Sequence, residues 1–333
     1  MRATVIGSGT FGTACASLLA GRCEEVWLWG RDPALIAAIS TQHENPTYLP
    51  GIKLAPNVRA TTDVEEALNR SQLVVTAAPS HATREVMTRA APFVPPHVPV
   101  VTVTKGIEND TLRTMTEVLE DCLPETVHPY IAVLSGPSFA KEMVRRMPTV
   151  VTVAAQWERV AQQIQSVFQT DSFRVYTSKD VVGVQYGGAL KNVIAIAAGI
   201  SDGLGFGDNA RAALITRGLA EISRAAVREG ANPLTLSGLS GLGDLVLTCT
   251  GELSRNRQVG LALGRGRTIR QILDEMKQVA EGVRTARSAR DLAQKIGVDM
   301  PICEQVYAIT HENKDPRRAV VELMGRSPKP ELI

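Results

Sequence analysis

The 333-residue sequence has no large excess charge of one sign and no paired cysteines, and we expect that no apolar run approaches the length needed to span a membrane. A net charge of +2 does not favour nucleic acid or an anionic membrane as a partner. The five cysteines are scattered without a C-x-x-C pair, which predicts reduced thiols and neither a disulfide framework nor a metal site. The strand expected at the N-terminus leaves no room for a signal peptide. These absences favour a cytoplasmic protein that acts on small molecules.

The glycine-rich segment near the N-terminus is the strongest functional signal. An apolar strand over residues 3–6 leads into Gly7, Gly9 and Gly12, and a helix follows. Gly7 permits the tight turn, Gly9 lets a pyrophosphate approach the backbone, and Gly12 allows close packing of the helix on the sheet. The N–H groups at the helix start favour a diphosphate. We predict a dinucleotide site; the alternative is a glycine-rich turn without a ligand.

The end of the second expected strand bears on the choice between cofactors. An apolar run over residues 25–29 ends at Gly30, and the next residue is Arg31. NAD-selective sites usually carry an acidic residue here, whereas an arginine can pair with a 2′-phosphate. Asp32 is typical of a helix N-cap, with Pro33 at the first helical position. We therefore predict NADPH as cofactor, with NAD possible, and a surface-loop cation as the alternative role of Arg31.

The alternation of patterns predicts an α/β fold. Strands and helices alternate up to about residue 180, and only helical patterns follow. We expect a Rossmann-type dinucleotide-binding domain with a mostly parallel sheet over residues 1–180, and an all-α substrate-binding and catalytic domain over 181–333. In such sheets ligands bind where the strands end. Residues 43–51 are predicted to form a loop, and residues 111–123 a helix.

One lysine in the helical half has the surroundings expected of an acid/base group. Lys191 and its neighbour Asn192 are the polar residues in an apolar helical stretch over residues 189–196. Gly187 and Ala195, one turn to either side, predict a small-residue face through which a ligand reaches the amine. Desolvation lowers the pKa of a lysine towards the range used in proton transfer. The alternative is a lysine that extends to solvent from the edge of a core helix.

Two further positions favour an anionic substrate. Lys105 follows a strand, where its charge can face an anion and lower the pKa of Lys191; the alternative is a surface turn. Ser254 is typical of a helix N-cap, and Arg255 follows it, so the helix N–H groups and the guanidinium predict a phosphate site. The glycine-rich segment 238–245 follows no strand and is not predicted to bind a second nucleotide.

Several motifs recur together along the chain. They are GSGTFGTA (7–14), HEN (43–45), PSH (79–81), TKGIE (104–108), SGPSFA (135–140), LKN (190–192), GLGDL (241–245), SRN (254–256) and VAEG (279–282). In this order the set closely resembles the bacterial NAD(P)-dependent glycerol-3-phosphate dehydrogenases, over essentially the whole chain.

The resemblance implies reversible hydride transfer between NAD(P)H and dihydroxyacetone phosphate, giving sn-glycerol 3-phosphate for phospholipid synthesis. Lys191 matches the general acid/base, and Lys105 would add positive potential beside it. The positions expected to bind the cofactor are Gly7, Gly9, Thr10, Phe11, Gly12, Arg31, Lys105, Ala140, Arg255, Val279 and Glu281. Those expected to bind the substrate are Lys105, Gly136, Ser138, Lys191, Asp244, Ser254, Arg255 and Asn256. We expect a homodimer and no metal.

Two alternatives remain at this point. One is a 3-hydroxy-acid or ketopantoate-type reductase of similar architecture, which would bind a carboxylate in place of a phosphate. The other is a non-catalytic NADP-binding regulator, which would not need a desolvated Lys191.

Overall fold

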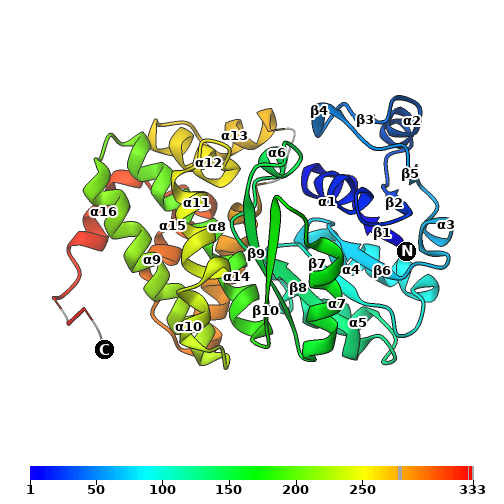
Figure 1. Cartoon of the computed structure of the whole chain (residues 1–333). Helices are drawn as coiled ribbons and strands as arrows, with labels where there is room; N and C mark the ends of the chain where they lie inside the picture. Colours follow the sequence, from blue (N-terminus) through cyan, green and yellow to red (C-terminus); the bar gives the residue numbers. More distant parts are fainter. Residues whose placement is uncertain (277–279, 329, 332–333) are drawn as a thin grey trace.

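The computed structural model describes residues 1–276, 280–328 and 330–331. A sheet with its covering helices forms one side of the molecule, where the N-terminus lies, and a group of helices forms the other side, towards the C-terminus (Figure 1). The strands are β1 (Arg2–Ile6), β2 (Glu25–Trp29), β3 (Glu44–Asn45), β4 (Leu49–Lys53), β5 (Val58–Thr61), β6 (Leu73–Thr76), β7 (Val100–Thr102), β8 (Ile131–Ser135), β9 (Thr149–Ala155) and β10 (Phe173–Ser178).

The helices alternate with the strands in the first half and follow one another in the second. Those of the first half are α1 (Thr10–Ala20), α2 (Pro33–Gln42), α3 (Val64–Leu68), α4 (Ser80–Ala90), α5 (Met115–Cys122), α6 (Ala140–Met143) and α7 (Glu158–Phe168). Those of the second are α8 (Val181–Gly203), α9 (Asp208–Arg228), α10 (Pro233–Leu236), α11 (Asp244–Thr250), α12 (Arg255–Gly264), α13 (Ile269–Glu275), α14 (Glu281–Ile296), α15 (Pro301–His311) and α16 (Pro316–Met324). Two short 3₁₀ helices are η1 (Ala91–Phe93) and η2 (His128–Tyr130), and a short π-helix is η3 (Leu239–Gly243).

Among the described residues, eight strands form one sheet in the order β10-β9-β8-β7-β6-β1-β2-β5. The strands pair in parallel except at β8 and β9, which run antiparallel. Val5 of β1 lies between Leu28 of β2 and Val75 of β6, and all three are fully buried. Apolar strands of this kind need cover on both faces. The predicted Rossmann-type, mostly parallel sheet is confirmed.

Helices cover both faces of this sheet. Leu19 of α1 and Phe168 of α7 are buried against one face, and Leu68 of α3 and Met87 of α4 against the other. Because the helices return the chain between parallel strands, the carboxyl ends of β1, β2, β6, β7 and β8 share one edge. That edge faces the helical side of the molecule, where the pocket described below lies.

Two local predictions for this half were wrong. The segment 43–51, expected to be a loop, contains β3 and part of β4, which pair as a small antiparallel hairpin. The helix expected from residue 111 begins only at Met115, because Thr114 and Glu117 form a capping box that fixes its start there. Residues 108–113 instead form a turn that closes on itself.

The helical side is built around α8. This helix is long and apolar enough to cross a membrane, so the expectation that no run approaches that length was wrong. However, 89% of its most apolar window is buried inside the protein, packed in a core that includes Ile194, Ile222 and Val259. It is the core helix of the second half. Ile107, which follows β7, is also part of this core.

Candidate active site

A pocket of about 440 Å³ lies where the carboxyl edge of the sheet meets the helical side. Its walls come from both halves of the chain. The predicted site residues that line it are Gly7, Gly9, Thr10, Phe11, Arg31, Lys105, Ser138, Lys191, Asp244, Ser254, Arg255, Asn256 and Glu281. Residues as far apart in the sequence as Gly7 and Glu281 are therefore brought into one cavity.

The glycine loop has the geometry that the pattern predicts. Gly7 has φ +121°, and a Cβ there would lie 2.8 Å from the backbone of Ala77, so no other residue fits. A Cβ on Gly12 would lie 1.8 Å from the Gly7 oxygen, so α1 packs directly on the turn. Gly9 is the N-cap of α1, and a Cβ there would meet nothing within 4 Å. The loop therefore leaves open space beside the first turn of a helix that lines the pocket.

The β3–β4 hairpin holds this loop in place through Asn45. The side chain is fully buried, and its Nδ2 donates to the Ser8 carbonyl at 2.9 Å and to Thr13 Oγ1 at 2.8 Å. Asn45 Oδ1 accepts from the Tyr48 backbone N–H at 3.0 Å. The 43–45 motif contributes to the family resemblance, but no role was predicted for Asn45.

Arg31 is exposed at the pocket wall, directly after β2. Asp32 next to it caps α2, because its Oδ1 accepts from the N–H groups of Ala34 at 2.9 Å and Leu35 at 3.3 Å. The predicted N-cap is confirmed. Asp32 also lines the pocket, so the end of β2 presents the Arg31 guanidinium beside a carboxylate whose Oδ1 is engaged by the helix start.

Lys191 is buried in α8 with a side chain 6% exposed. Its Nζ lies 2.9 Å from Asp244 Oδ1 and donates to Thr248 Oγ1 at 2.6 Å. Burial lowers the pKa of this amine from 10.5 to about 8; the charge of Asp244 raises it, and the nearby charge of Lys105 lowers it. The amine is therefore mostly protonated at neutral pH and loses its proton as the pH rises through about 8.

The predicted route to this amine was wrong. A Cβ on Gly187 would lie 2.5 Å from the Ser240 carbonyl, so the backbone of η3 covers that face, and Ala195 is fully buried. Access comes instead from the pocket, which Lys191 and Thr248 both line.

Asp244 links the two lysines. Lys105 Nζ contacts Asp244 Oδ2 at 2.7 Å and donates to the Gly136 carbonyl at 2.9 Å, which also accepts from Ser138 Oγ at 2.9 Å. Reasoning from the residues alone did not single out Asp244 or Thr248. Their spacing of four residues, on one face of a helix, was the available signal.

The start of α12 presents the guanidinium of Arg255 to the pocket. Ser254 Oγ accepts from the Arg257 N–H at 3.2 Å, which confirms the predicted N-cap. The half-buried Arg255 guanidinium forms no hydrogen bond or ion pair with any described residue. Burial lowers its pKa, and the nearest charge that opposes this shift is that of Glu281. A half-buried guanidinium without a protein partner favours the binding of an anion.

An amide chain connects this helix start with Lys105. Asn256 accepts from the Gly282 N–H through Oδ1, at 2.9 Å, and donates to Asn192 Oδ1 at 2.9 Å. Asn192 in turn donates to the Lys105 carbonyl at 3.4 Å. The network therefore aligns α8, α12 and α14 around the pocket.

Glu281 joins the two halves at the pocket wall. Its carboxylate accepts from the Ser80 N–H at 3.0 Å and from Ser80 Oγ at 2.5 Å.

Three predicted site residues, Gly12, Gly136 and Ala140, do not line the pocket, although each adjoins it, Ala140 through Phe139. Val279 lies outside the described residues. Within the described part of the chain, no group of three or more His, Cys, Asp or Glu side chains is arranged to hold a metal ion.

The fold and the site define the class: a nicotinamide-nucleotide-dependent oxidoreductase with a Rossmann-type sheet facing a helical substrate side. Models of the NAD-dependent glycerol-3-phosphate dehydrogenase N-terminus and C-terminus match residues 2–161 and 180–321. The chain belongs to the NAD(P)-dependent glycerol-3-phosphate dehydrogenase family.

Individual relatives agree with this membership. Glycerol-3-phosphate dehydrogenase (NAD(P)+) of Myxococcus xanthus is 69% identical over 332 residues, covering 100% of this chain and 99% of the relative. That of Anaeromyxobacter sp. is 60% identical and covers 100% of both chains. The crystal structure of glycerol-3-phosphate dehydrogenase from Coxiella burnetii superposes with a TM-score of 0.93 at 38% identity, covering 98% of this chain and 99% of that one. Neither the keto-acid reductase nor the non-catalytic regulator is supported.

Proposed function

We propose that this pocket reduces dihydroxyacetone phosphate to sn-glycerol 3-phosphate, reversibly, with Lys191 as the proton donor. The observation that carries the proposal is that one cavity contains two cationic side chains, a lysine with a lowered pKa and an arginine that can pair with an anion. Lys191 is buried with a pKa of about 8, and the half-buried Arg255 guanidinium has no hydrogen-bond or ion-pair partner among the described residues. The first suits proton transfer to a ketone oxygen, and the second suits a phosphate.

The residues at the sheet edge fit a nicotinamide dinucleotide. The glycine loop leaves room beside the first turn of α1, and helix N-termini favour a diphosphate. Arg31 lines the pocket and would pair with the 2′-phosphate of NADPH, and NAD would bind without that contact. Thr10 and Phe11 line the same wall, as does Glu281. When bound, NAD(P)H supplies the hydride to the substrate carbonyl.

The lysine pair serves the charge that develops on the substrate oxygen. Protonated Lys191 donates its proton to that oxygen in reduction, and neutral Lys191 accepts a proton in oxidation. Asp244 orients both amines, and Lys105 adds positive potential where the negative charge forms. Gly136 and Ser138 contribute by fixing the Lys105 amine from the opposite side.

The α12 start would hold the phosphate. Arg255 offers a guanidinium that no other described residue pairs with, and Ser254 and Asn256 are adjacent to the first N–H groups of the helix. Binding at this end orients the ketone relative to Lys191, which converts the encounter into an intramolecular step.

The experiment that tests the proposal follows nicotinamide absorbance with purified protein. Dihydroxyacetone phosphate is compared with dihydroxyacetone and with ketopantoate, and NADPH with NADH. We expect turnover of the phosphorylated ketone and at least about 100-fold lower kcat/KM without the phosphate. Preference for ketopantoate would contradict the proposed substrate.

The organisation around this site is also a proposal. We assign residues 1–180 to cofactor binding and 181–333 to substrate binding, because the last strand ends at Ser178 and α8 begins at Val181. We further propose a homodimer in the cytoplasm. Light scattering of the purified protein tests the oligomeric state.

A further inference from the structure

The segment after β7 crosses from the sheet side to the helical side within four residues. Lys105 pairs with Asp244 at 2.7 Å, and its carbonyl accepts from Asn192. Ile107 is 3% exposed and lies in the core built around α8. Glu108 ends the crossing and turns back to the sheet side. An interaction that fixes Glu108 therefore also fixes the C-terminal end of the segment that contains Lys105.

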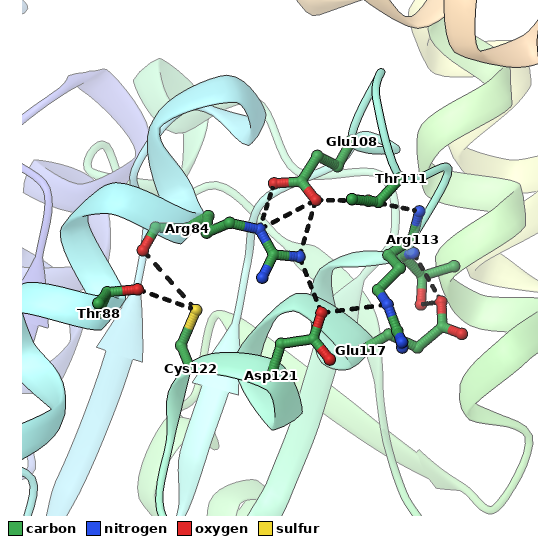
Figure 2. Close-up of polar contacts among 9 residues, drawn as sticks. Arg84, Thr88, Glu108, Thr111, Arg113, Glu117, Asp121 and Cys122 are labelled. Carbon is green, nitrogen blue, oxygen red and sulfur yellow. Dashed lines mark hydrogen bonds and ion pairs between the residues drawn. The ribbon is translucent and has the colours of Figure 1, made fainter.

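Arg84 of α4 clamps Glu108 with two nitrogens, as Figure 2 shows. Nε lies 2.9 Å from Oε1, and Nη2 lies 2.8 Å from Oε2. Thr111 Oγ1 donates to the same Oε2 at 2.5 Å. The Glu108 side chain is only 14% exposed, so solvent screens this pair less than an ordinary surface ion pair. The guanidinium also contacts Asp121 of α5 at 2.9 Å.

The turn over residues 108–113 is closed by its own backbone bonds, and the Glu108 carboxylate connects it to α4. Glu108 N–H donates to the Arg113 carbonyl, and Leu112 N–H donates to the Glu108 carbonyl, each at 2.9 Å. Ile107 and Thr114 form an isolated antiparallel β-bridge. These bonds close the turn on itself. The Arg84–Glu108 pair then ties it to α4, the helix whose first residue, Ser80, contacts Glu281 at the pocket.

We propose that Arg84 and Glu108 are positioning residues, which hold the Lys105 segment so that the Lys105 amine stays against Asp244. Neither residue lines the pocket, so they act through Lys105 and do not touch the substrate. The inference rests on the proposed function only for the choice of substrate in its test.

The test compares Glu108→Gln and Arg84→Met with Asp121→Asn as a matched control. Asp121 accepts from the same guanidinium and from Arg113 of the turn, and no hydrogen bond or ion pair joins it to residues 103–108. We expect kcat/KM for dihydroxyacetone phosphate to fall at least about ten-fold in the first two variants and less than about two-fold in the control, because small displacements of a charged group are costly to the reaction. The Kd for NADPH should change less than about three-fold, since the glycine loop is untouched.

A pH profile separates positioning from a general loss of stability. The groups that face the Lys191 amine are Asp244, Lys105, Thr248 and the buried thiol of Cys249. If Lys105 moves away, one positive charge leaves and Asp244 is shared less, and both changes raise the pKa of Lys191. The titration step of kcat/KM should therefore move to higher pH in Glu108→Gln and stay in place in Asp121→Asn.

The outcomes separate the two proposals. Wild-type kcat/KM and an unmoved pH step in Glu108→Gln and Arg84→Met overturn the positioning role, and so does an equal loss in Asp121→Asn. If the larger changes prevent folding, Arg84→Lys decides: it keeps the charge but loses the paired geometry, and an intermediate loss is expected. A wild-type protein without turnover of dihydroxyacetone phosphate would instead contradict the proposed function. In that case, the pKa of Lys191 by NMR in the same variants still tests the positioning role.

Discussion

Replacing Lys191 by methionine removes the amine and keeps the apolar stem in place. The variant loses the 2.9 Å contact with Asp244 Oδ1 and the 2.6 Å bond to Thr248 Oγ1. Asp244 keeps Lys105 at 2.7 Å, and Thr248 still donates to the Asp244 carbonyl at 2.6 Å. The buried carboxylate therefore remains paired, and we expect the variant to fold and to bind NADPH.

The expected loss of turnover follows from the role of the amine. A positioned general acid contributes about 10² to 10⁴ in rate, which corresponds to about 3–5 kcal/mol of transition-state stabilisation. With a pKa of about 8, the wild-type amine loses its proton as pH rises through that value. Ketone reduction should therefore slow above about pH 8, and alcohol oxidation, which needs the neutral amine, should speed up over the same range. In Lys191→Met, neither the reduction rate nor the oxidation rate should change with pH in this range.

The assay combines steady-state kinetics in both directions, NADPH binding by fluorescence and the thermal midpoint on one preparation. Lys179→Met is the control, because that lysine is 72% exposed and pairs with Glu158 at the surface. We expect less than about two-fold change in its kcat. Near-normal kcat in Lys191→Met with intact NADPH binding, or an unmoved pH step, would show that Lys191 has only a structural role.

Four further changes test the remaining parts of the site. Arg255→Ala should lower kcat/KM for dihydroxyacetone phosphate by about 30- to 1000-fold, the scale of a lost charge-assisted pair, and an unchanged value would refute a phosphate contact. Arg31→Ala should raise KM for NADPH and leave that for NADH nearly unchanged; equal losses would assign it to a part that both cofactors share. Asp244→Asn should move the Lys191 titration step below pH 8, because the carboxylate raises that pKa, and an upward shift in the pH profile would contradict this. Asn45→Ala should weaken NADPH and NADH binding alike by about ten-fold, measured by fluorescence, because the glycine loop loses its donor; unchanged Kd values would exclude that support.

The features that depend on a few neighbouring residues were readable from the sequence. The positive φ at Gly7, the Asp32 cap of α2 and the Ser254 cap of α12 follow from turn and capping chemistry that acts within four residues. The apolar strands alternating with helices determined the sheet class for the same reason. The desolvation of Lys191 was also predictable, since an apolar helix on all sides must be buried.

The partners of these residues were decided only by the tertiary structure. Ser80 and Glu281 lie 201 positions apart, and Lys105 and Asp244 lie 139 apart, so no local pattern pairs them. The predicted opening beside Gly187 failed for this reason, because which face of a core helix is covered depends on the segment that packs on it. Composition and periodicity specify that a surface is buried and not what buries it. The pairing of Lys191 with Asp244, the sharing of Asp244 with Lys105, and an Arg255 guanidinium without a polar partner among the described residues follow from distances that exist only in the folded chain.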